Sequence, residues 1–118
     1  MYDQVKTPLE QAEEFFNSAR EELYKPEEDV VHYMVCRSAY KAVQNYLIAY
    51  LTMQKVKTNP TMTLESLLGL CRESSNDFNN LKLDLLYNAH EQEDVWMDLG
   101  TAQEFMDLAI QTKALVEQ

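Results

Sequence analysis

Residues 26–55 read PEEDVVHYMVCRSAYKAVQNYLIAYLTMQK, and this stretch decides the fold. Wound as a helix of 3.6 residues per turn, it gathers its polar side chains on one narrow side and is apolar over about half its circumference or more. The polar side consists of Arg37, Lys41, Gln44, Thr52 and Lys55. Because several neighbours must cover so much apolar surface, the sequence predicts one continuous helix from Pro26 to about Lys55 at the centre of a bundle.

Helical spacing and capping residues predict further helices on both sides of this segment. The first helix begins at a capping box formed by Thr7 and Glu10, with Pro8 in its first turn, and it ends near Tyr24. A short helix is predicted over 63–72, a fourth over about 76–89, and a last one that begins at a second capping box, Thr101–Glu104, and reaches Val116. The inward residues expected on the last two are Phe78, Leu81, Leu85 and Ala89, and then Phe105, Leu108, Thr112 and Leu115.

These elements predict an all-α fold, a single up-and-down bundle of four to five helices with a long central second helix. A chain of 118 residues is expected to form one domain, residues 1–118. The connections are short, so consecutive helices are expected to pack roughly antiparallel.

The formal net charge of −10 disfavours general binding to phosphate backbones. A local basic patch remains open, because Arg20, Lys25, Arg37 and Lys41 all lie in the first half; the alternative is that they form a solvated face. The N-terminus has no signal-peptide pattern, and no apolar run has the length of a membrane span. We expect a cytoplasmic protein.

The two cysteines, Cys36 and Cys71, lie on predicted apolar faces and are interpreted as small core hydrophobes. They form no metal-binding spacing with each other or with a histidine cluster, and we expect neither a metal nor a cofactor. The sequence also lacks phosphate-binding loops and the common hydrolase and metalloprotease motifs.

Two histidines are candidates for chemistry. His32 projects onto the apolar side of the long helix, where it is either a ligand-binding residue in a cleft or a core-edge histidine with a hydrogen-bond partner. His90 would share a helix face with Asp94 and is either half of a metal site or a cation near a helix end. Trp96 is interpreted as a partner anchor or as a lid on the bundle.

Three stretches together resemble the HEPN family of small, often dimeric helical bundles, and the likeness rests on their order and spacing. They are Pro8–Phe16, Met34–Leu47, and a third that runs from Leu64–Leu68 through Tyr87–His90 to Ala102–Ala109. The resemblance implies either a ribonuclease toxin of a toxin–antitoxin pair or a non-catalytic relative.

Catalytic HEPN members carry an arginine and then a histidine with four to six residues between them, and this sequence departs from that pattern. Leu83, Asp84 and Leu85 stand before His90, and Lys25, Pro26 and Glu27 stand before His32. A cation is needed to steady the phosphate during RNA cleavage, and Asp84 would do the opposite. We therefore expect a non-enzymatic protein.

The non-catalytic relatives imply an interaction or accessory module. It is expected to form a homodimer, with a nucleotide or a nucleotidyltransferase-type protein as partner, and direct nucleic-acid binding is not expected. The candidate ligand-binding residues are Arg37, Tyr40, Lys41 and His32. The alternatives are a HEPN-type ribonuclease that uses a displaced arginine, Arg20 or Arg72, with His90, and an unrelated helical bundle that binds a small molecule or a metal.

Overall fold

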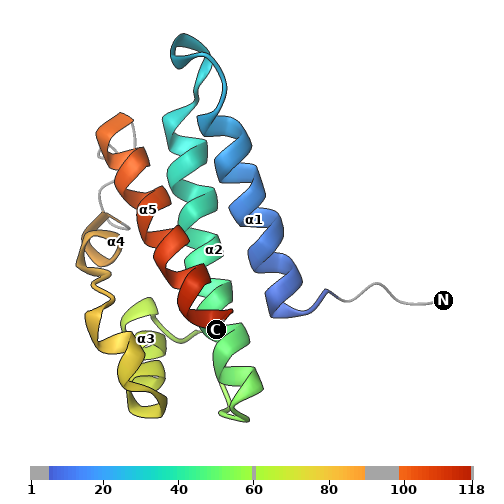
Figure 1. The fold of residues 1–118 in the computed structure, drawn as a ribbon, viewed down its shortest axis with the longest axis vertical. Helices are drawn as coiled ribbons and strands as arrows, with labels where there is room; N and C mark the ends of the chain where they lie inside the picture. The colour runs from blue at the N-terminus through green and yellow to red at the C-terminus, as the bar shows by residue number, and fades with distance from the viewer. Residues whose placement is uncertain (1–5, 60, 90–98, 118) are drawn as a thin grey trace, which may run out of the picture.

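The computed structural model describes residues 6–59, 61–89 and 99–117, and over these residues the chain is all-α (Figure 1). Five α-helices and two short 3-10 helices follow one another: α1 (Pro8–Leu23), η1 (Glu27–Asp29), α2 (His32–Met53), α3 (Leu64–Ser74), η2 (Asn76–Asn80), α4 (Asp84–Ala89) and α5 (Leu99–Val116). The predicted all-α bundle is confirmed.

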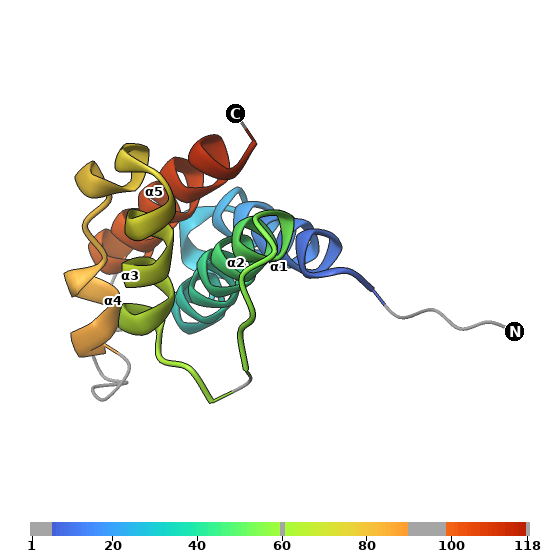
Figure 2. The ribbon, with the colours of Figure 1, turned by 90° about the horizontal axis from the view of Figure 1, so that it is seen from below.

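Helix α2 occupies the centre of the bundle, as predicted. It packs mainly against α1 and α5, and more lightly against α3. In both views α3 and α4 lie on the side away from α1 (Figures 1 and 2). The α2 residues buried by these neighbours are Val35, Cys36, Ala39, Ala42, Val43, Tyr46, Leu47, Ala49 and Leu51. The polar side of α2 stays outside this core, with Arg37 and Thr52 exposed.

The predicted start of the long helix was wrong, because α2 begins at His32 and not at Pro26. Residues 27–29 form the separate 3-10 helix η1, and Val30 and Val31 are extended, with ψ of 127° and 96°. The N–H of Val31 donates to a carboxylate oxygen of Glu22 at 2.9 Å. A contact with α1 therefore fixes the extended backbone at the point where a helix was expected.

The single helix predicted over 76–89 was also wrong. The chain forms η2, leaves helical structure over residues 81–83, where Leu81 is extended, and only then forms α4. Arg72 holds this break, because its guanidinium donates to the carbonyl oxygens of Phe78 at 3.3 Å and Leu81 at 2.7 Å. Leu81 and Leu83 are both buried, which an extended segment with alternating side chains permits.

Of the two capping boxes predicted at Thr7 and Thr101, only the first is present. The first capping box is present: the Thr7 hydroxyl accepts from the Glu10 N–H, and the Glu10 side chain accepts from the Thr7 N–H. The second prediction was wrong, because α5 already includes Leu99 and Thr101 is buried inside its first turn. No helix in the described part of the chain is long and apolar enough to cross a membrane.

Candidate functional site: a groove between α1 and α5

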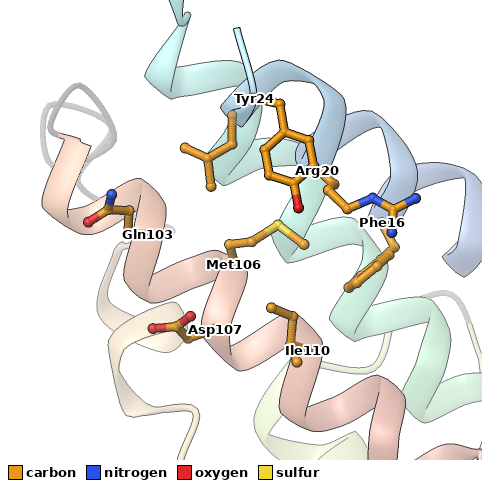
Figure 3. A pocket seen from close by; sticks show the side chains of 8 residues that line it. Phe16, Arg20, Tyr24, Gln103, Met106, Asp107 and Ile110 are labelled. Atoms are coloured by element: carbon orange, nitrogen blue, oxygen red, sulfur yellow. The ribbon is translucent and has the colours of Figure 1, made fainter. Parts of the chain in front are cut away.

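Helices α1 and α5 both pack on α2 but make few contacts with each other, and a groove of about 330 Å³ lies between them (Figure 3). We call it the α1–α5 groove. Its lining comes from the second half of α1 and the middle of α5 and consists of Phe16, Arg20, Leu23, Tyr24, Gln103, Met106, Asp107 and Ile110.

The α1–α5 groove has a buried apolar floor and an exposed apolar rim. Phe16 and Met106 lie at the floor and are nearly buried. Tyr24, the residue that caps α1, is 78% exposed, and Ile110 on α5 is 49% exposed. Figure 3 shows Tyr24 reaching from α1 toward Met106 on α5. Large apolar side chains that gather around a hollow are typical of a binding surface.

One charge of each sign stands in the α1–α5 groove. Arg20 on α1 donates to the side-chain oxygen of Asn17 at 3.1 Å, and its guanidinium lies 5.8 Å from the centre of the Phe16 ring. Asp107 stands on the α5 wall and is exposed. Within the described residues, neither Arg20 nor Asp107 forms an ion pair.

A polar cluster joins three helices beside the Phe16 end of the groove. Lys113 of α5 donates to both carboxylate oxygens of Glu13 of α1, at 2.9 Å each, and to Glu117 at 2.5 Å. The hydroxyl of Tyr46 on α2 donates to the same Glu13 carboxylate. The Lys113 ammonium also lies 5.4 Å from the centre of the Phe16 ring.

The electrostatics of this cluster favour its charged, fully paired form. Burial alone would raise the pKa of Glu13, but hydrogen bonds from Tyr46 and Lys113 outweigh burial and bring it below the ordinary value. Burial would likewise lower the pKa of Lys113, and hydrogen bonds to Glu117 and Glu13 raise it instead. The pKa of Tyr46 is raised by burial and by its bond to Glu13. Because each polar group already has a partner, the cluster acts as a clamp between helices and offers no free general base.

A second cavity of about 300 Å³ lies where α2 and α5 end beside η2. Its lining includes Tyr50, Asp77 and Phe78, and the rings of Tyr50 and Phe78 are 4.7 Å apart between centres. Phe78 is nearly completely buried, whereas Met53 and Gln54 on the same lining are exposed.

The four predicted ligand-binding residues do not converge on either cavity. Arg37 is exposed on the outer side of α2, and Lys41 is half-buried one turn further along. Tyr40 is half-buried, and burial raises the pKa of its hydroxyl. His32 is half-buried at the first position of α2. None of the four lines the α1–α5 groove or the second cavity.

The displaced arginines proposed for a ribonuclease occupy different places. Arg20 lines the α1–α5 groove, whereas Arg72 is engaged by the carbonyl groups of Phe78 and Leu81. His90, Asp94 and Trp96 lie outside the described residues. In the described ranges, no group of three or more histidine, cysteine or acidic side chains could hold a metal ion.

Sequence reasoning missed the α1–α5 groove because it depends on how two distant helices lie against α2. One signal was present. Ile110 falls outside the inward face predicted for the last helix, Phe105–Leu108–Thr112–Leu115, and Tyr24 lies at the very end of the first. An isoleucine on an outward helix face becomes informative only once the fold gathers it with other apolar side chains into one patch.

Comparisons of this chain with protein-family models, with curated proteins and with solved structures find no match. The resemblance to HEPN domains therefore rests on the order of residues in the sequence, and the family assignment stays a prediction.

Proposed function

We propose that this chain is a non-catalytic interaction module, HEPN-like in its helix order, whose α1–α5 groove binds the apolar side of a protein helix. The observation that carries the proposal is the pair of exposed apolar side chains, Tyr24 and Ile110, on facing walls above the nearly buried Phe16 and Met106.

The shape of the groove suits a helix as its occupant. Two neighbouring helices that both rest on α2 leave a channel along their length, and a further helix packs into such a channel at the usual interaxial distance of about 8–10 Å. Side chains spaced one turn apart would then meet Tyr24, Met106 and Ile110 in succession. Arg20 and Asp107 provide polar contacts that fix the register of the bound helix.

The non-catalytic part of the proposal is supported by how the polar groups are used. In the clamp, Glu13 and Lys113 form an ion pair and the Tyr46 hydroxyl donates to the Glu13 carboxylate. Arg72, one of the two arginines considered for a ribonuclease mechanism, instead donates hydrogen bonds to the backbone before α4. The HEPN resemblance adds candidates for the partner, namely a second copy of the chain or a nucleotidyltransferase-type protein. A nucleotide at Arg37, Tyr40 and Lys41 stays a prediction.

Site-specific photo-crosslinking in living cells tests the proposal. A photoreactive phenylalanine analogue is placed at position 110 in the groove and, separately, at position 34 on the outer side of α2. Ile110 is 49% exposed and Met34 is 51% exposed, so the two positions are matched for access to solvent. The adducts are identified by mass spectrometry, with Tyr24→Asp as the groove variant.

The proposal predicts one dominant protein adduct from position 110 that is lost when Tyr24→Asp is added. It also predicts that position 34 gives no comparable adduct. Adducts of equal yield and identity at the two positions would show that the α1–α5 groove has no special role and would contradict the proposal.

A further inference from the structure

The α5 side of the α1–α5 groove is bordered by acids. Asp107 lines the groove and lies apart from Arg20 of α1 (Figure 3). Glu104 stands three positions before Asp107, a spacing that puts the two side chains on the same side of a helix. Both are exposed, and within the described residues neither forms an ion pair. We call these two residues the α5 edge.

No base of α5 offsets the charge of the α5 edge. The one basic residue of the helix is Lys113, and it is engaged by Glu13 and Glu117 in the clamp. The α5 edge therefore keeps both negative charges for a partner.

The α1 side of the groove carries both signs of charge. The Arg20 guanidinium lies 5.8 Å from the centre of the Phe16 ring and donates to Asn17, and the next residue, Glu21, is exposed. An acid and a base of comparable exposure stand side by side in the sequence here, so this wall sets no net preference for the charge of a partner.

The floor of the groove selects an apolar side chain only loosely. Met106 is 5% exposed, and its unbranched, polarizable side chain adapts to neighbours of different shape. The discrimination between one apolar helix and another must then come from the charges at the edges.

We propose that the occupant of the α1–α5 groove is a helix of another protein, with lysine or arginine beside its apolar stripe on the flank that lies along the α5 edge. This inference rests on the proposed function and specifies the chemistry of the partner. The net charge of −10 acts in the same direction, because it attracts a basic segment at long range. An anionic lipid surface, which could also accept Tyr24 and Ile110, would be repelled by the same charges.

The test is a selection from phage-displayed helices of about 20 residues, a length that supports helix formation when the outward positions are alanine. The stripe positions carry leucine, isoleucine, methionine or phenylalanine, and each flank position carries lysine, glutamate or glutamine in equal proportion. The library is selected on the immobilised chain at about 0.15 M salt, which screens distant charges. Clones that also bind the Tyr24→Asp variant are discarded.

The selected clones are expected to carry lysine in preference to glutamate by about threefold or more at the positions of one flank. The double variant Glu104→Gln, Asp107→Asn should abolish this preference. As a matched control, Glu65→Gln with Glu73→Gln removes the same charge from α3 and should leave the preference unchanged. All four acids are exposed, so both double variants are expected to fold, which circular dichroism checks.

The possible failures are distinguishable. Helices that depend on Tyr24 but show no preference for lysine would overturn the basic flank and leave the proposed function standing. A lysine preference that survives in Glu104→Gln, Asp107→Asn would reflect the net charge of the chain and would also overturn the inference. If no selected helix depends on Tyr24, both the inference and the proposed function are wrong.

Discussion

Lys113 near the end of α5 and Glu13 near the start of α1 are 100 positions apart in sequence, and the lysine donates to both oxygens of the carboxylate at 2.9 Å. The same carboxylate accepts from the hydroxyl of Tyr46 on α2. One side chain therefore joins α1, α2 and α5, and it fixes the two walls of the α1–α5 groove relative to each other.

A double-mutant cycle measures the strength of this clamp. Glu13→Gln keeps an acceptor for Tyr46 but loses the ion pair, and Lys113→Met keeps the apolar stem but loses the charge. We expect each to lower the free energy of unfolding and the pair to show a coupling of about 1 kcal/mol, because both side chains are partly exposed. Urea denaturation of the four proteins gives the value, and strictly additive effects would show that the contact contributes nothing.

The clamp also predicts a dependence of stability on pH. The folded-state pKa of Glu13 lies below its ordinary value of 4.5, so its contribution is complete above that value and is lost as the pH falls through the folded-state pKa. The folded-state pKa of Lys113 lies above 10.5, so its contribution is complete below 10.5 and is lost as the pH rises further. Denaturation curves should therefore separate wild type from Glu13→Gln at neutral pH and converge in acid.

Glu22 is expected to control the start of α2. It is 7% exposed, accepts from the Val31 N–H at 2.9 Å and pairs with Lys25 at 2.9 Å. Glu22→Ala should lower the free energy of unfolding by about 1–3 kcal/mol, because it removes a charged acceptor from a nearly buried position. Its exposed neighbour provides the control, and Glu21→Ala should change stability by less than about 0.5 kcal/mol. Equal effects of the two substitutions would argue against this role.

Arg72 is expected to be structural. Arg72→Ala removes both hydrogen bonds to the carbonyls before α4 and should lower the free energy of unfolding by about 1–3 kcal/mol. Lys82→Ala, which removes a cation from the exposed side of the same segment, should have little effect. Thermal denaturation compares the two. A ribonuclease activity abolished by Arg72→Ala in a variant of unchanged stability would instead support the enzymatic alternative.

The two thiols are expected to be inert while the chain is folded. Cys36 and Cys71 are both fully buried, and burial raises the pKa of Cys71 to about 12. Because the thiolate is the reactive form, a disulfide reagent at pH 8 should label neither cysteine until the chain unfolds, at a rate that follows global unfolding. Rapid labelling of one thiol under native conditions would show that the core opens locally.

Local sequence signals predicted those elements whose causes are local. The capping box at Thr7, the apolar sides of α2 and the short helix predicted over 63–72, which is α3, all depend on residues a few positions apart. The start of α2 depends instead on Glu22, a residue of the preceding helix that takes the Val31 N–H. The sequence of residues 26–29, a proline followed by three acids, resembles a helix start, and it led to the wrong boundary for α2.

The break between η2 and α4 had a partial signal. Residues 81–84 alternate in sequence between leucine and a charged residue, which is the pattern of an extended segment rather than a helix. In the structure the two leucines are buried and Lys82 and Asp84 are exposed. The sequence signal for the α1–α5 groove was weaker, because the two walls come from opposite ends of the chain and are brought together only by packing on α2. Arg37, Tyr40 and Lys41 followed from family resemblance and His32 from its place on the apolar side of the helix, and neither argument identifies the surface that faces a partner.

Hydroxyl-radical footprinting of the chain, alone and together with the protein that crosslinks to position 110, tests most directly whether the α1–α5 groove is the binding surface. Tyr24 reports on the groove, and Met34 and Met53, which are comparably accessible on other faces, serve as internal references. If the partner binds in the groove, oxidation of Tyr24 should fall severalfold on binding while that of Met34 and Met53 does not change. Protection of Met34 or Met53 with Tyr24 still fully oxidised would contradict it.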